Sequence, residues 1–170
     1  MRRIDCLSLA AFVLLAASGF GFSATAATPA DDDFVMKAAN GGKMEVEFGR
    51  LAAKKARNGA VKSFGRRMVV DHTKAGNKLK MLASRKHITL PSDMDAEERE
   101  AMQRLAALSG SEFDRAYMEM MVSDHEKDVA EFETESQSGT DSDVRAFAAR
   151  TLPTLKVHLR LARETAQKVK

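Results

Sequence analysis

Apolar and polar residues alternate along most of this chain with the period of an amphipathic α-helix. Apolar side chains recur every three or four residues through four long segments, at positions 33–57, 60–86, 111–136 and 142–168. A shorter helix is expected over positions 95–108. Alternation with a period of two is rare, and Ala, Met, Leu, Lys, Arg and Glu dominate the composition. The pattern predicts an all-α protein.

The connections between these segments indicate how the helices are arranged. Asn58-Gly59 and Gly139-Thr140 each mark a short turn within a helix pair. The two pairs are joined by a connection of roughly 24 residues that contains the short helix. Up-down-up-down bundles use short loops, whereas a long middle crossover is the ferritin-like arrangement. We therefore expect a ferritin-like four-helix bundle with a short extra helix in the crossover, and a kink at Pro153 in the last helix.

A short repeat relates the two helix pairs. Val61-Lys62-Ser63-Phe64 in the first pair resembles Val144-Arg145-Ala146-Phe147 in the second. The repeat suggests that both pairs are copies of one hairpin.

The first 26 residues have the pattern of a cleavable export signal. Two arginines precede a mostly apolar run over positions 7–22, and Ala24-Thr25-Ala26 is a small-x-small cleavage site. We expect the mature protein in the periplasm, soluble or peripherally associated with the cell envelope, with membrane contact only through the cleaved signal peptide. The expected division is a signal peptide over 1–26, a short linker over 27–33 and a helical domain over 34–168.

The composition excludes several classes of function. The single cysteine, Cys6, lies in the export signal, so the mature chain has no disulfide, thiolate metal site or cysteine nucleophile. The net charge is +3, and because acidic and basic residues are interspersed we expect no nucleic-acid partner. No nucleophile motif, phosphate loop or dinucleotide fingerprint occurs, and Gly41-Gly42 is interpreted as a packing notch or a local irregularity of the helix.

Each long segment carries one ionisable side chain in the middle of its apolar stripe. Burying a polar group costs free energy unless the group is paired or ligated. One such residue is unremarkable in a core, but four at matched positions indicate a site. The four residues are Glu45, His72, His125 and His158.

Their distances from the turns predict their heights in the bundle. Glu45 and His72 each lie 13 residues from the turn at Asn58-Gly59, which places them level. His125 and His158 lie 14 and 18 residues from the turn at Gly139-Thr140. At about 1.5 Å per residue, this predicts an offset of roughly 6 Å for His158.

A repeated sequence surrounds two of the histidines. Met68-Val69-Val70-Asp71-His72 and Met121-Val122-Ser123-Asp124-His125 share the pattern Met-Val-x-Asp-His. Residues four apart lie on one helix face, so Met68 and Met121 are candidate auxiliary soft ligands. Asp71 and Asp124 are candidate residues to orient an imidazole, and Tyr117 lies near the same face.

The types of ligand narrow the choice of metal. Imidazole, carboxylate and thioether groups together fit copper or zinc best. A di-iron oxygen-activating centre requires Glu-x-x-His pairs, and no buried face of this chain carries one. The first hypothesis is therefore a periplasmic copper- or zinc-binding protein for buffering, sensing or stress response, with the metal ion as its partner.

Two alternatives remain open. The same four residues could form a polar core network without any cofactor, in a non-catalytic structural or interaction module of the envelope. A metal-dependent oxidoreductase is the weaker alternative, because it rests on fold analogy alone. The sequence favours a protein that is not an enzyme.

Several motifs of the chain resemble a bacterial family, the domain of unknown function family 4142, over about Phe34 to Ala162. The family is often labelled as outer membrane proteins. The resemblance implies an exported, ferritin-like four-helix domain, and it implies neither a function nor catalytic residues. The motifs that carry it include Glu45-Val46-Glu47-Phe48-Gly49, Asp71-His72-Thr73, Phe113-Asp114-Arg115-Ala116-Tyr117, Asp124-His125-Glu126 and Leu152-Pro153 with His158-Leu159.

Overall fold

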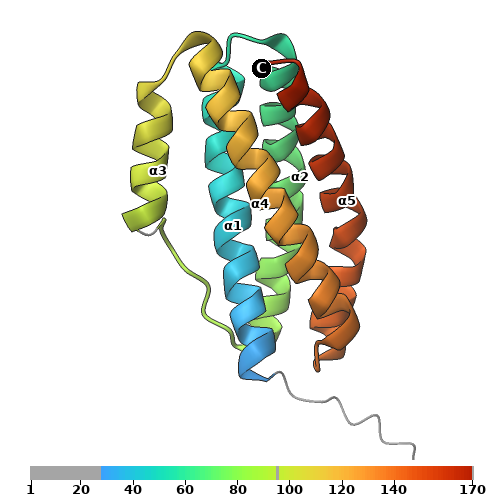
Figure 1. The fold of residues 1–170 in the computed structure, drawn as a ribbon. Helices are drawn as coiled ribbons and strands as arrows, with labels where there is room; N and C mark the ends of the chain where they lie inside the picture. The colour runs from blue at the N-terminus through green and yellow to red at the C-terminus, as the bar shows by residue number, and fades with distance from the viewer. Residues whose placement is uncertain (1–27, 95, 170) are drawn as a thin grey trace, which may run out of the picture.

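The computed structural model describes residues 28–94 and 96–169, and every regular element in this part of the chain is a helix. Four long helices form a bundle, and a fifth, α3, lies beside it in the connection from α2 to α4 (Figure 1). The predicted ferritin-like bundle with a short crossover helix is confirmed. The segment predicted as a signal peptide lies outside the described residues. The helices are α1 (Pro29–Lys55), α2 (Gly59–Lys86), α3 (Ala96–Ala107), α4 (Gly110–Ser138) and α5 (Ser142–Gln167).

The first helix begins earlier than the sequence pattern predicted. Thr28 is the N-cap: its hydroxyl accepts a hydrogen bond from the backbone N–H of Asp31, and the Asp31 carboxylate accepts one from the Thr28 N–H at 2.8 Å. Pro29 occupies the first helical position, where its missing N–H costs nothing. Most of the segment predicted as a linker over 27–33 is therefore helical.

The helices pair as two antiparallel hairpins. α1 packs on α2 and α4 packs on α5, and the hairpins face each other with α1 beside α4 and α2 beside α5. The connection after α2 returns along the bundle before α4 begins, and α3 fills part of that return (Figure 1). The last helix, α5, continues through Pro153, whose ring is exposed, so the proline does not break the helix.

Helices α1 and α2 approach each other closely at Gly49 and Gly65. A Cβ atom on either glycine would lie 2.7 Å from the carbonyl oxygen of the other, so the two backbones touch where neither residue has a side chain. The packing notch expected at Gly41-Gly42 is not found, because a Cβ on Gly41 would meet no described atom within 4 Å and one on Gly42 would make only an ordinary contact, 3.8 Å from Nδ1 of His72. Helix α1 is continuous through both glycines, so no local irregularity occurs there either.

Each hairpin turn is held by a carboxylate from the opposite hairpin. Asp114 of α4 accepts hydrogen bonds from the backbone N–H groups of Arg57 and Asn58, at 3.0 and 2.7 Å. Asp31 of α1 accepts one from the N–H of Thr140, at 2.9 Å. Asp31 and Asp114 are 83 positions apart, the same separation as Val61 and Val144 in the sequence repeat. The repeat therefore extends to the contacts that join the hairpins.

The apolar core consists of two clusters. One lies toward the α1–α2 turn and includes Phe48 and Met68, and the other lies toward the α4–α5 turn and includes Phe34 and Phe132. Each helix of the bundle has one buried polar residue between members of the two clusters, namely Glu45, His72, His125 or His158. A thin polar layer therefore divides the core.

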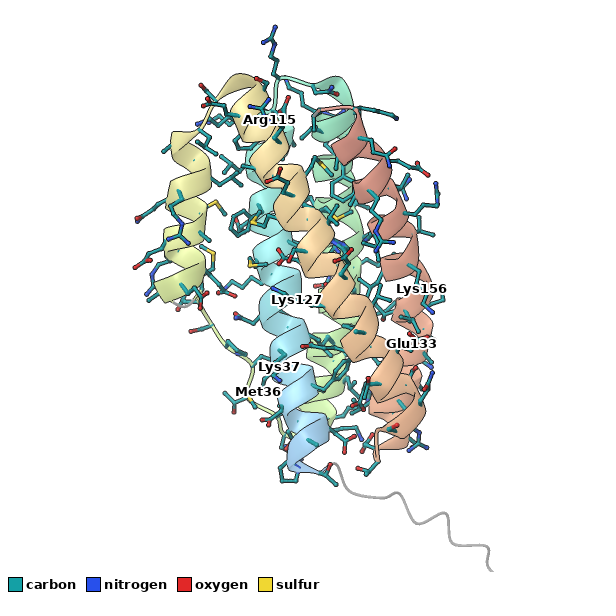
Figure 2. All side chains as sticks on the ribbon, viewed as in Figure 1. Met36, Lys37, Arg115, Lys127, Glu133 and Lys156 are labelled. Carbon is teal, nitrogen blue, oxygen red and sulfur yellow. The ribbon has the colours of Figure 1, made fainter. Side chains whose placement is uncertain are left out.

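Charged side chains cover the outer faces of the helices (Figure 2). Lys156 on α5 and Glu133 on α4 form one exposed ion pair, with Nζ 3.1 Å from Oε1. Such pairs contribute little to stability because solvent screens them. Among the described helices, none combines the length and apolar character needed to cross a membrane.

Candidate metal centre

Four side chains meet in the polar layer, one from each helix of the bundle. Glu45 comes from α1, His72 from α2, His125 from α4 and His158 from α5. Their exposed fractions are 1, 7, 0 and 1%. The structure thus brings together the four residues that the sequence pattern singled out, and their role as metal ligands stays a prediction.

A chain of polar contacts links three of the helices. Nε2 of His158 lies 2.8 Å from Oδ2 of Asp71 on α2. Nδ1 of His158 lies 3.3 Å from Nε2 of His72. Nδ1 of His72 in turn lies 2.7 Å from Oε2 of Glu45. Asp71 therefore orients the histidine of the neighbouring helix rather than His72, which follows it in the sequence.

His125 is held by the backbone of its own helix. Its Nδ1 lies 2.9 Å from the carbonyl oxygen of Met121. Because a carbonyl oxygen only accepts, Nδ1 carries the proton, and Nε2 of the neutral ring presents a lone pair. Nε2 lies 3.1 Å from Oε1 of Glu45, but among the described residues neither atom has a partner with hydrogen-bond geometry. Two buried acceptors that face each other are satisfied by a proton or by a cation beside them.

The contacts also fix the orientation of His158. Because its Nε2 donates to Asp71, its Nδ1 presents a lone pair toward Nε2 of His72. The three histidines each offer one ligand atom, and these atoms lie within 4.8 Å of one another. Two nitrogens on one tetrahedral zinc ion, each at about 2.0–2.1 Å, lie roughly 3.3–3.4 Å apart. The His72–His158 pair already has about this spacing, at 3.3 Å, and nitrogens that lie up to 4.8 Å apart must move closer together to bind one ion. The donor set therefore suits a transition-metal ion bound by three imidazoles, after a small adjustment of the side chains.

Glu45 has a different position from the histidines. One carboxylate oxygen contacts Nδ1 of His72, and the other faces Nε2 of His125. Within the described residues, the group whose ligand atoms are mutually close contains the three histidines without Glu45. The geometry places Glu45 to orient the imidazole of His72 and to face that of His125, and its predicted role as a fourth ligand stays a prediction.

Burial sets the protonation of these groups. Desolvation lowers the pKa of His72 and of His158 to about 4, and it also lowers the pKa of His125. The three rings are therefore neutral at pH 7, which is the form that binds a metal. Desolvation raises the pKa of Glu45 to about 7, against the opposing effect of His125. Glu45 thus changes its charge near neutral pH.

The predicted offset of His158 is not observed. The ring centroid of His158 lies 5.2 Å from that of His72 and 5.4 Å from that of His125. Helical Cα–Cβ bonds tilt toward the N-terminus of their helix. This direction points toward the α4–α5 turn for His158 and away from it for His125. The two side chains therefore converge although they lie at different distances along the chain from the turn.

The predicted auxiliary methionines and tyrosine lie in the apolar cluster next to the site. Met68, Met121 and Tyr117 are fully buried there. The Tyr117 ring stacks on Phe113 with centroids 6.1 Å apart, and its hydroxyl has no hydrogen-bond partner in the described chain. Burial raises the pKa of Tyr117 above its ordinary value. The soft-ligand role of the methionines stays a prediction.

Two aspartates of α4 flank the site differently. The buried Oδ2 of Asp124 has no hydrogen-bond partner among the described residues, so the structure shows no contact that orients a histidine. Asp128, which the sequence analysis missed, lines a cavity of about 30 Å³ together with Glu45 and His72. Burial raises the pKa of Asp128 to about 8, and the Glu45 charge adds to this effect. Asp128 lies three residues after His125 and therefore on the same helix face, and this spacing could have identified it from the sequence.

Comparison with known proteins relates the chain to one sequence family and to one fold. A family model described as "Domain of unknown function (DUF4142)" matches residues 20–165. A search of curated proteins finds no match.

Three solved structures share the fold. A DUF305 fragment from Deinococcus radiodurans has a TM-score of 0.73 and 13% identity, covering 84% of this chain and 99% of that chain. CopM in its Cu(I)-bound form has a TM-score of 0.68 and 15% identity, covering 81% and 96%. CopM in its Cu(II)-bound form has a TM-score of 0.65 and 13% identity, covering 82% and 97%. At these identities the likeness establishes the shared helical fold.

Proposed function

The chain belongs to the DUF4142 family, and we propose that it binds a copper ion in the core of its bundle. The ligands are His72, His125 and His158. The observation that carries the proposal is the group of three buried, neutral imidazoles, each with a ligand atom within 4.8 Å of the others. The copper-bound forms of CopM, which share the fold, support copper over zinc.

The charges around the histidines suit a buried cation. An ion in a protein core needs counter-charges close to it, because desolvation is costly. The Asp71 carboxylate contacts His158, and Glu45 contacts His72 and faces His125. Two carboxylates next to three neutral ligands supply negative charge close to the ion. Carboxylates that bond to the ring of a ligating histidine also raise its basicity and fix its orientation.

The role we propose is copper binding for buffering, sensing or stress response in the periplasm. The location rests on the export signal predicted over residues 1–26. A site in the core between four helices shields a bound ion from competing ligands outside the protein, which suits storage and buffering.

Elemental analysis of the protein tests this function. The protein is purified from the periplasm without chelators and without a histidine tag, beside a His72→Ala/His125→Ala double variant. We expect near-stoichiometric copper in the parent and none in the variant. A His87→Ala variant, altered at an exposed position at the end of α2, is the control and is expected to keep its copper. If the parent contains stoichiometric zinc and no copper, the site binds metal but the choice of copper is wrong.

A polar core network is the second candidate, and one observation favours it. The contacts from Asp71 through His158 and His72 to Glu45 connect three helices without any ion. Such a network specifies which helices pack together. A thermal melt separates the two functions, because a ligand that binds the folded state raises the melting temperature. If neither copper nor zinc raises it and the purified parent contains neither, the structural network is the better account.

A further inference from the structure

His72 is the histidine of the cluster that lies nearest to the surface. It is 7% exposed, against 0% for His125 and 1% for His158. A surface groove of about 510 Å³, formed by α1, α2 and the connection that follows α2, reaches His72. The smaller cavity of about 30 Å³ also borders His72. The groove and the cavity share three lining residues, Gly42, His72 and Gly76.

The packing of the bundle does not require either of these two glycines. A Cβ on Gly42 would lie 3.8 Å from Nδ1 of His72, which is an ordinary contact, and a Cβ on Gly76 would meet no described atom within 4 Å. Neither residue has a positive φ. At Gly49 and Gly65, by contrast, a Cβ would collide with backbone. Glycine inside a helix lowers stability relative to alanine, so what Gly42 and Gly76 provide is open space beside His72.

We propose that Gly42 and Gly76 form a port through which the metal ion reaches and leaves the histidines, with His72 as the first ligand that it meets. This inference rests on the proposed copper function. A port matters because His125 and His158 are almost completely buried. Without one, exchange of the ion requires partial opening of the bundle, and its rate then follows the stability of the fold.

Two side-chain contacts lie along the groove outside the port. Lys43 on α1 donates a hydrogen bond across the groove to the carbonyl oxygen of Ser92 in the connection after α2. Arg50 pairs with Glu47 on the same helix. Because His72 lines the groove in the folded protein, an ion that enters the groove reaches His72 without separation of α1 from α2.

The first test measures the kinetics of copper exchange in Gly76→Leu and Gly42→Ala variants. Metal-free protein takes up copper(I), and the loaded protein then loses it to an excess of chelator. We expect both rates to fall about tenfold or more in Gly76→Leu, and less in Gly42→Ala. The dissociation constant is expected to stay within about threefold of the parent, because a port changes the barrier and leaves the end states alone.

Gly41→Leu is the matched control, since Gly41 is also a helical glycine with open space at its Cβ but does not line the groove or the cavity. If slowing reflects a more stable helix, this control slows as well. If copper uptake and loss are equally fast in Gly76→Leu and Gly41→Leu, the proposed port is wrong. A change in the dissociation constant with unchanged uptake also overturns it.

A second test uses the metal-free protein and is independent of the copper function. Diethyl pyrocarbonate modifies accessible imidazoles, and mass spectrometry assigns the modification among the four histidines of the chain. We expect His72 to react faster than His125 and His158, and we expect Gly76→Leu to slow His72 while leaving the exposed His87 unchanged. Equal reactivity of His72 in parent and variant overturns the port. A further outcome is that the parent binds no copper although Gly76→Leu still slows the modification of His72. This outcome rejects the proposed function, and with it the role of the port in copper exchange.

Discussion

Nε2 of His158 on α5 lies 2.8 Å from Oδ2 of Asp71 on α2, and this contact decides which nitrogen of His158 faces the other histidines. Asp71 precedes His72, and Asp124 occupies the same place before His125 in the second copy of the pattern Met-Val-x-Asp-His. The structure gives Asp124 no corresponding hydrogen bond to a histidine among the described residues. One aspartate of the pair therefore orients an imidazole across helices, and the other does not.

The first prediction compares these two aspartates. Asp71→Asn removes the charge beside His158 and keeps a similar shape, so the imidazole becomes a weaker ligand. We expect copper affinity to fall by about 10- to 100-fold, measured by competition with a copper(I) chelator. Asp124→Asn is the matched control and is expected to change the affinity little. Equal losses in the two variants would contradict the assigned role of Asp71.

The second prediction concerns the pH dependence of stability in the metal-free protein. Burial lowers the pKa of His158 to about 4, from 6.5. Between these values the unfolded chain binds a proton that the folded protein does not bind. The stability that neutral His158 allows is therefore complete above pH 6.5, and it is lost as the pH falls toward 4.

His158→Gln removes this titration. As the pH falls through that window, the free energy of unfolding of the parent is expected to decrease relative to that of the variant. Urea denaturation at several pH values measures the difference. Parent and His158→Gln curves that stay parallel would show that His158 is not buried in its neutral form.

Periodicity and chemistry were sufficient to predict the helices and the four residues of the polar layer. An apolar stripe on each helix is interrupted by one polar residue, namely Glu45, His72, His125 or His158. Because the stripe faces the core, the residue within it faces the core as well. The crossover length identified the ferritin-like arrangement for a similar reason, because a long connection must return along the bundle. These features depend on spacing along one helix or one loop.

The features that could not be predicted depend on contacts between helices. The partner of Asp71 is on α5, and only the rotation of α2 against α5 determines that it is His158. The convergence of His125 and His158 depends on side-chain direction in antiparallel helices, which residue counting ignores. Gly42 and Gly76 come from different helices, so the opening that they share with His72 has no signature in either segment alone.

The third prediction tests whether the Tyr117 hydroxyl contributes to copper binding. Its hydroxyl is buried without a hydrogen-bond partner among the described residues, and an unsatisfied buried hydroxyl costs about 1–3 kcal/mol. Tyr117→Phe removes the hydroxyl and keeps the ring that stacks on Phe113. We expect the melting temperature to stay the same or rise and copper affinity to stay unchanged. A marked loss of copper affinity would instead give Tyr117 the auxiliary role that the sequence suggested.

The fourth prediction concerns the contact between α1 and α2. Gly49→Ala places a Cβ 2.7 Å from the carbonyl oxygen of Gly65, and backbone cannot move aside as a side-chain end can. The helices must separate, and we expect a loss of about 1–3 kcal/mol in the free energy of unfolding. Gly41→Ala, in open space on the same helix, is expected to gain about 0.5–1 kcal/mol. Chemical denaturation of both variants measures the contrast, and a stabilised Gly49→Ala would refute the close approach.

The fifth prediction links copper binding to a proton on Glu45. Burial raises the pKa of Glu45 to about 7, so in the metal-free protein this carboxyl is mostly protonated near pH 6. His72 and His158, with pKa values of about 4, are neutral there. A cation held by the histidines favours the ionised carboxylate beside them, and binding therefore expels the Glu45 proton.

Calorimetry in buffers of different ionisation enthalpy counts the released protons. At about pH 6 we expect roughly one more proton per bound ion in the parent than in Glu45→Gln, because only the parent has this carboxyl to ionise. Near pH 8 the difference is expected to disappear, since Glu45 is then already ionised. Glu47→Gln, on the same helix but paired with Arg50 at the surface, is the control and is expected to behave as the parent. If the parent and Glu45→Gln release equal numbers of protons near pH 6, the ion does not bind beside Glu45. It then also lies away from His72 and His125, whose ring nitrogens are next to this carboxylate.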